Sequence, residues 1–81
     1  MSGPSISQVL GGNIRDRRKA LGYNQETFGR IIGIRQQSLS AIERGEAAPR
    51  VERLPAIAQV LDCEVFELFL DGDWKVSRVR R

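Results

Sequence analysis

The segment from Arg35 to Arg44 carries the side chains best suited to recognising another molecule. On a helical wheel four residues lie opposite Leu39 and Ile42: Gln37, Ser40, Ala41 and Arg44. Gln36 lies at the exposed first turn of the same helix. Glutamine can bond to N6 and N7 of adenine, arginine to guanine, and serine or alanine can touch the methyl group of thymine. This face holds no carboxylate. It therefore favours reading of duplex DNA over a merely solvated helix face, which would more often mix Glu and Lys.

The chain contains few of the residues that serve as catalytic groups or metal ligands. There is no histidine, and the single cysteine, Cys63, lies next to acidic residues and has no second cysteine for an internal disulfide. No nucleophile and base can be paired, and no ligand set for a metal can be assembled. We expect no enzyme activity, no metal and no cofactor.

Charge is distributed unevenly along the chain. Residues 1–51 carry eight Lys and Arg against four Asp and Glu, whereas residues 52–73 carry one basic residue against six acidic ones. Residues 74–81 add four basic residues and no acidic one. A basic front and an acidic rear would orient a protein toward a polyanion, although an ordinary mixed surface is the simpler alternative.

Length and hydropathy indicate one small domain. A chain of 81 residues has room for one modest core, which disfavours a large catalytic cleft. No run approaches the roughly 18 apolar residues that span a bilayer, and the start lacks the features of a signal peptide. We expect a cytoplasmic protein without a membrane partner. Residues 1–5 are expected to be disordered, 6–72 to form the domain, and 73–81 to be a basic tail.

Five helices must position the recognition face. Apolar spacing predicts a first helix from Ile6 to Gly22, firm only from about Asn13 because the Gly11-Gly12 pair weakens its start. Asn24 should cap a second helix that ends at Gly33, with Phe28, Ile31 and Ile32 on its inner face. A third runs from about Arg35 to Arg44, and Gly29 would let it cross the second closely. A fourth begins near Pro55 with Leu54, Ile57, Ala58 and Leu61 inward, and a short fifth covers residues 65–70.

One charged residue interrupts the inner stripe of the first helix. Arg18 stands four residues after Ile14, where an apolar side chain is expected. A buried guanidinium needs a carboxylate, and Glu43 flanks the inner stripe of the third helix. An ion pair between Arg18 and Glu43 would fix the two helices together; the alternative is that Arg18 extends to solvent.

The continuous run from Asn24 to Gly45, NQETFGRIIGIRQQSLSAIERG, resembles the Cro/repressor-type (XRE-like) helix-turn-helix family. It looks closest to the N-terminal domains of lambdoid phage repressors, and the resemblance covers roughly residues 6–72. It implies an all-α, compact five-helix domain like that of the lambda repressor, with the helix-turn-helix formed by the second and third helices. The implied function is that of a transcription regulator, expected to be a repressor, which reads a double-stranded DNA operator through the major groove.

The resemblance also implies roles for individual residues. Gln36 and Gln37 match base-reading positions, with Ser40 and Ala41 nearby, and Arg18 and Glu43 match a family ion pair. The implied phosphate contacts are Asn24, Gln25, Arg35, Arg44 and Arg50. Gln25 is also a candidate for placing the first recognition glutamine. Three residues differ from those usual in the family, so the operator cannot be copied from a relative. Arg35 stands where the family often has a Ser or Thr helix cap, and Arg50 where a small polar residue is common. Ala41 replaces a longer side chain that could extend base reading.

A domain of this size is normally selective only as a dimer, because two copies read half-sites about one DNA turn apart. We expect a homodimer whose interface is an aromatic and apolar cluster: Phe66, Phe69, Leu70 and Trp74. Ordinary core is the alternative for most of this cluster. The tail from Lys75 to Arg81 could be a swapped strand, a DNA-contacting arm or a loose tail. A further alternative is an antitoxin-type DNA-binding protein whose fifth-helix surface or tail binds a protein partner.

Overall fold

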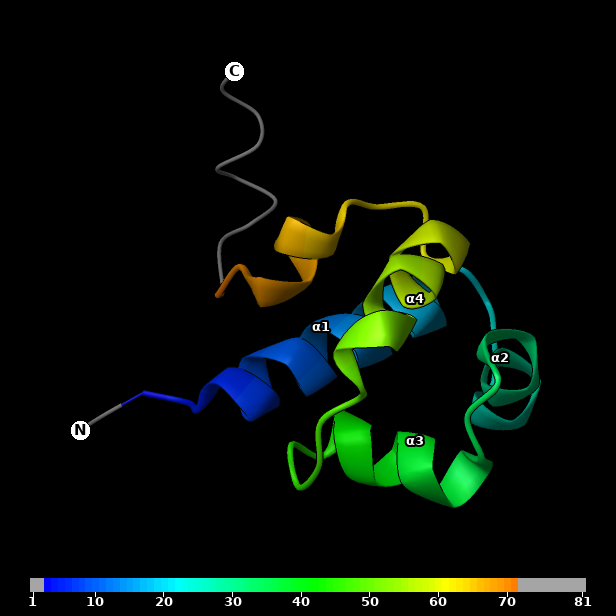
Figure 1. Cartoon of the computed structure of the whole chain (residues 1–81), viewed down its shortest axis with the longest axis horizontal. Coiled ribbons are helices and arrows are strands. Elements are labelled where there is room, and N and C mark those ends of the chain that lie inside the picture. The colour runs from blue at the N-terminus through cyan, green and yellow to red at the C-terminus, as the bar shows by residue number, and fades with distance from the viewer. Residues whose placement is uncertain (1–2, 72–81) are drawn as a thin grey trace.

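A computed structural model describes residues 3–71, and over that range the chain is all-α, as predicted. The elements are α1 (Ile6–Ala20), α2 (Gln25–Ile32), α3 (Gln36–Glu43), η1 (Val51–Arg53), α4 (Leu54–Val60) and η2 (Val65–Phe69). In Figure 1, α1 crosses the middle of the molecule, α3 lies along the lower edge and α2 stands at the right. Helices α2 and α3 form the predicted helix-turn-helix, which packs on α1 and α4.

The first helix begins earlier than its glycines suggested. α1 starts at Ile6 because Ser5 and Gln8 cap it reciprocally: the Ser5 hydroxyl accepts from the Gln8 backbone amide, and the Gln8 side chain accepts from that of Ser5. Ser5 is therefore part of an ordered cap rather than of a disordered start. Gly11 is required by packing, since a Cβ there would clash with the Ile42 carbonyl at the end of α3. α1 and α3 consequently approach backbone to backbone.

The turn between α2 and α3 needs two glycines for different reasons. Gly33 ends α2 with φ at +75°, a left-handed conformation that a side chain disfavours. A Cβ on Gly29 would press against the Ile34 carbonyl oxygen. The space at Gly29 therefore accommodates the backbone of the turn, whereas the sequence predicted a close crossing by the third helix.

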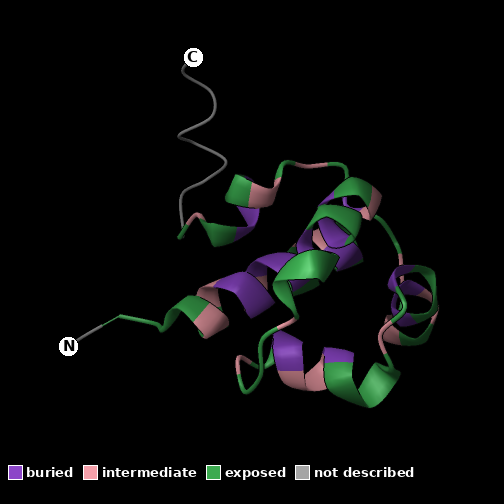
Figure 2. Ribbon diagram, in the orientation of Figure 1, coloured by how far each residue is buried: buried purple, intermediate pink, exposed green. Residues whose placement is uncertain are grey.

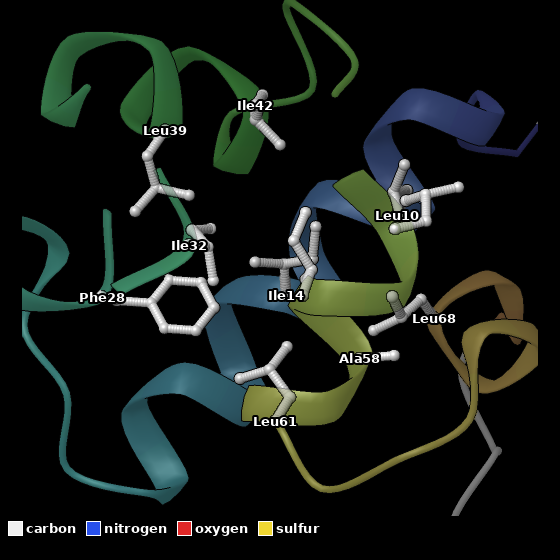
Figure 3. Packing of buried hydrophobic residues seen from close by; sticks show 11 residues of the cluster. Leu10, Ile14, Phe28, Ile32, Leu39, Ile42, Ala58, Leu61 and Leu68 are labelled. Carbon is white, nitrogen blue, oxygen red and sulfur yellow. The ribbon is translucent and has the colours of Figure 1, made fainter. Parts of the chain in front are cut away.

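The hydrophobic core joins all four α-helices to η2. Its fully buried side chains are Ile14, Phe28, Leu39, Ile57 and Leu68. Figure 3 shows Ile14 in the middle of this cluster, with side chains from α3 and α4 directed into the same interior. The inward prediction for Ile31 was wrong, because Phe28 and Ile32, one turn apart, already form the inner face of α2 and leave Ile31 51% exposed.

The fifth helix is a 3-10 helix rather than an α-helix. Within η2, the Glu67 carboxylate accepts from the Glu64 backbone amide at 2.8 Å. The side-chain amide of Asn13, which is buried in α1, donates to the carbonyls of Leu68 and Leu70 at 2.7 and 2.8 Å. These long-range bonds use backbone acceptors at the end of the segment. They hold η2 against α1 as a short, tightly wound turn.

Candidate nucleic-acid interface

The outer face of α3 is polar and is exposed at its start. Gln36 and Gln37 are exposed, and Ser40 and Ala41 are partly exposed on the following turn. Leu39 is fully buried between them. Figure 2 shows this change along α3, exposed at its start and partly covered farther along. The helix therefore presents its two glutamines to solvent from a backbone that is fixed by the core.

A buried ion pair connects α1 to α3 behind that face. The Arg18 guanidinium donates from Nε and Nη2 to both carboxylate oxygens of Glu43, at 2.7 and 2.9 Å. Its Nη1 donates to the Tyr23 carbonyl at 2.7 Å. Both side chains are buried, with 7% and 3% of their surface exposed. Arg18 does not extend to solvent, and the pair fixes the end of α3 against α1.

The start of α2 is bound into the same network. Asn24 caps α2 as predicted, its side-chain oxygen accepting from the Thr27 backbone amide at 2.8 Å. The side chain of Gln25 donates to Glu43 at 3.0 Å. Its amide is thus directed to the buried ion pair and is not bonded to Gln36. Asn24 is exposed and Gln25 partly exposed, so both stand near the surface at the N-terminus of α2.

The remaining predicted phosphate contacts lie around the ends of α3. Arg35 occupies the position before its first turn without forming a side-chain cap, and Arg50 precedes η1; both are exposed. Arg44 follows the last turn and donates to the Ser40 hydroxyl and, at 3.0 Å, to Glu46. This hydrogen bond and the charge of Arg44 lower the pKa of Glu46 below its ordinary value.

Sequence reasoning missed Glu46 as a partner of the recognition helix. Its carboxylate also raises the pKa of Arg44, first through the hydrogen bond and then through charge attraction. The two residues are only two positions apart, and an Arg-x-Glu spacing after a predicted helix end is the signal that could have indicated the pair. Glu46 would therefore compete with a phosphate group for the Arg44 guanidinium.

The residues that were predicted to form the dimer interface differ in their exposure. Phe66 is 63% exposed and Phe69 37% exposed, so neither belongs to the core. Leu70 is partly buried, and Trp74 lies outside the described residues. A shallow groove of about 1360 Å³ runs between α4 and η2, with Phe66 and Leu70 in its lining and Asp62 and Glu64 also bordering it. The structure thus brings an apolar surface and acidic residues together on one side.

Between residues 3 and 71, no group of three or more His, Cys, Asp or Glu side chains is arranged to hold a metal ion. None of the helices in this range combines the length and apolar character that a membrane crossing requires.

Known proteins are similar to this chain in sequence. A family model named helix-turn-helix matches residues 14–68. Repressor protein C2 of Salmonella phage P22 is 34% identical over 73 residues, which cover 90% of this chain but 33% of that protein. An uncharacterized HTH-type transcriptional regulator, YazB of Bacillus subtilis, is 37% identical over 62 residues, covering 76% of this chain and 90% of its own length.

A solved structure is similar to this chain in fold as well. The solution structure of the DNA-binding domain of the P22 C2 repressor superposes with a TM-score of 0.72 at 37% identity, covering 84% of this chain and 88% of that one. The chain therefore corresponds to about a third of the full P22 repressor and to nearly all of its DNA-binding domain.

Proposed function

We propose that this chain, which belongs to the helix-turn-helix family whose model it matches, is a sequence-specific DNA-binding transcription regulator of the repressor type. The observation that carries the proposal is the placement of Gln36 and Gln37. Both are exposed at the start of α3, while Leu39 and Ile42 of the same helix are buried. This arrangement allows α3 to lie in a major groove with its glutamines toward the base edges.

Base recognition then depends on hydrogen-bond geometry. A glutamine amide offers a donor and an acceptor side by side, which match N7 and N6 of adenine. Ser40 and the methyl group of Ala41 lie one turn farther on, where they can contact a thymine methyl group or a base edge. The buried Arg18–Glu43 pair supports the function indirectly, because it limits rotation of α3 about its own axis.

Backbone contacts would surround the reading face. We assign phosphate contacts to Asn24, Gln25, Arg35, Arg44 and Arg50, all of which are exposed or partly exposed near the ends of α2 and α3. Contacts of this kind fix the register of a protein on the duplex without reading its sequence. Arg44 has to exchange Glu46 for a phosphate if it is to take part.

We further propose that the domain acts as a homodimer. The exposed rings of Phe66 and Phe69, together with Leu70 and Trp74, are assigned to a homodimer interface, with residues 6–72 as the folded unit and 73–81 as its tail. A symmetric pair would place two α3 helices about 34 Å apart, one turn of DNA. The name of the P22 relative supports a repressor.

Selection of binding sites from random duplex DNA tests this function. The proposal expects enriched sites with two related half-sites in inverted orientation, spaced by about one helical turn. Enrichment of no sequence, with equal binding to every duplex, would contradict it.

A further inference from the structure

The arginines of residues 3–71 fall into two groups by their partners. Five of them pair with a carboxylate at 3.9 Å or less: Arg15, Arg17, Arg18, Arg30 and Arg44. The other three, Arg35, Arg50 and Arg53, have no carboxylate partner within the described range. Two of these three were expected to contact phosphate, whereas sequence analysis assigned no role to Arg53.

The three arginines without a carboxylate partner share one location. They line a hollow of about 400 Å³ between the α2–α3 turn and the segment that leads into α4. The rest of its lining carries no negative charge; it consists of Gly33, Ile34, Ser38, Ile42, Ala48 and Pro49. Three like charges around one hollow repel one another unless an anion lies among them. The hollow therefore has the charge of an anion site.

Arg53 is held in place within this group. Its Nη1 donates to the Ile32 carbonyl at 3.0 Å, an acceptor in the last turn of α2, where the helix dipole is negative. Gly33 leaves room for this contact, since a Cβ there would lie 2.6 Å from Nη1. A guanidinium has five N–H donors in a rigid fork, so an arginine anchored through one nitrogen can still bind an anion through the others.

We infer that this hollow binds a single phosphate group, with Arg53 as its anchored member and Arg35 and Arg50 closing around the same group. The inference rests on the proposed function for the source of the phosphate, the DNA backbone. Free inorganic phosphate has the same chemistry and is the other possible source. Arg35 and Arg50 then act together on one phosphate rather than on two separate ones.

Salt-dependent binding to a duplex without an operator tests the site. Arg50→Ala, Arg53→Gln and the double variant are compared with Arg30→Gln, which removes an exposed, paired arginine from α2. Each single change should weaken binding roughly three- to tenfold but reduce the salt slope by less than about 0.9, the value for one phosphate, because the remaining guanidiniums still neutralise that phosphate. The double variant should reduce the slope by no more than about 0.9 in total. A slope loss of about 1.8 in the double variant, or an Arg53→Gln variant that behaves like Arg30→Gln, would overturn the single site.

A second variant separates anchoring from folding. Arg53→Gln frees the Ile32 carbonyl and lowers stability, so binding is measured well below its melting temperature. Arg53→Lys keeps the positive charge but loses the planar fork. We expect Arg53→Lys to bind between the wild type and Arg53→Gln; equality with the wild type would overturn the role of the anchored guanidinium.

Titration of the protein with inorganic phosphate, followed by amide NMR, distinguishes the two sources. The site predicts shifts at residues 33–35 and 50–53 that disappear in Arg53→Gln. If these shifts occur but the wild type binds no duplex, the phosphate site stands and the DNA function fails. If duplex binding is selective while Arg53→Gln changes neither the salt slope nor the shifts, the function stands and the site is overturned.

Discussion

Arg18 on α1 and Glu43 on α3, 25 residues apart in the sequence, share two hydrogen bonds of 2.7 and 2.9 Å in the interior of the domain. Glu43 also accepts from Gln25 at the start of α2. One carboxylate therefore connects three helices, including both members of the helix-turn-helix. The orientation of the recognition face depends on a charge that the chain has buried.

Removal of that carboxylate should destabilise the whole domain. Glu43→Ala leaves the Arg18 guanidinium buried without its counter-ion, and we expect a loss of about 3 kcal/mol in the free energy of unfolding. Thermal unfolding measures it, with Glu26→Ala as the control because Glu26 forms an exposed pair with Arg30. The control should change stability by less than about 1 kcal/mol. Equal effects of the two substitutions would show that the buried pair contributes nothing special.

The adjacent glycines of α1 should respond in opposite directions to the same substitution. Gly11→Ala forces a methyl group against the Ile42 carbonyl and should destabilise the fold by about 2 kcal/mol. Gly12→Ala meets no atom within 4 Å and should stabilise α1 by about 0.5–1 kcal/mol. Denaturant unfolding of both variants compares them directly. Stabilisation by Gly11→Ala would contradict the close approach of α1 and α3.

Apolar spacing located the helices, and the polar interruption at Arg18 pointed to Glu43, because both signals lie in local periodicity. Gly11 was interpreted only as a weak helix residue, since its contact with Ile42 lies 31 positions away in the chain. The bonds from Asn13 to η2 and from Arg53 to α2 are likewise long-range. They depend on how the elements pack and leave no periodic trace.

The hydrogen bond between Arg44 and Glu46 should weaken binding to DNA. Glu46→Gln removes the charge that holds the Arg44 guanidinium, and we expect tighter binding to any duplex together with a salt slope steeper by about 0.9. Glu26→Gln is the matched control, because it removes the same charge from an exposed pair on α2. Fluorescence anisotropy at several salt concentrations measures both. Weaker binding by Glu46→Gln would mean that Glu46 itself takes part in recognition.

The exposed ring of Phe66 should govern self-association. Phe66→Asp places a charge in the proposed dimer interface, so the dissociation constant of the dimer should rise about tenfold or more. Val51→Asp is the control, because Val51 is also apolar and is 76% exposed. It lies in η1, outside the proposed interface. Sedimentation equilibrium without DNA reports the association. A dimer unaffected by Phe66→Asp would remove this surface from the interface.

Base reading by the glutamines at the start of α3 is tested by the affinity of Gln37→Ala for two duplexes. One duplex contains the selected operator and the other, which serves as the control, a scrambled sequence of equal length. We predict that Gln37→Ala weakens operator binding by about 1–3 kcal/mol and leaves scrambled binding unchanged. Equal losses on both duplexes, or no loss on either, would contradict base reading by α3.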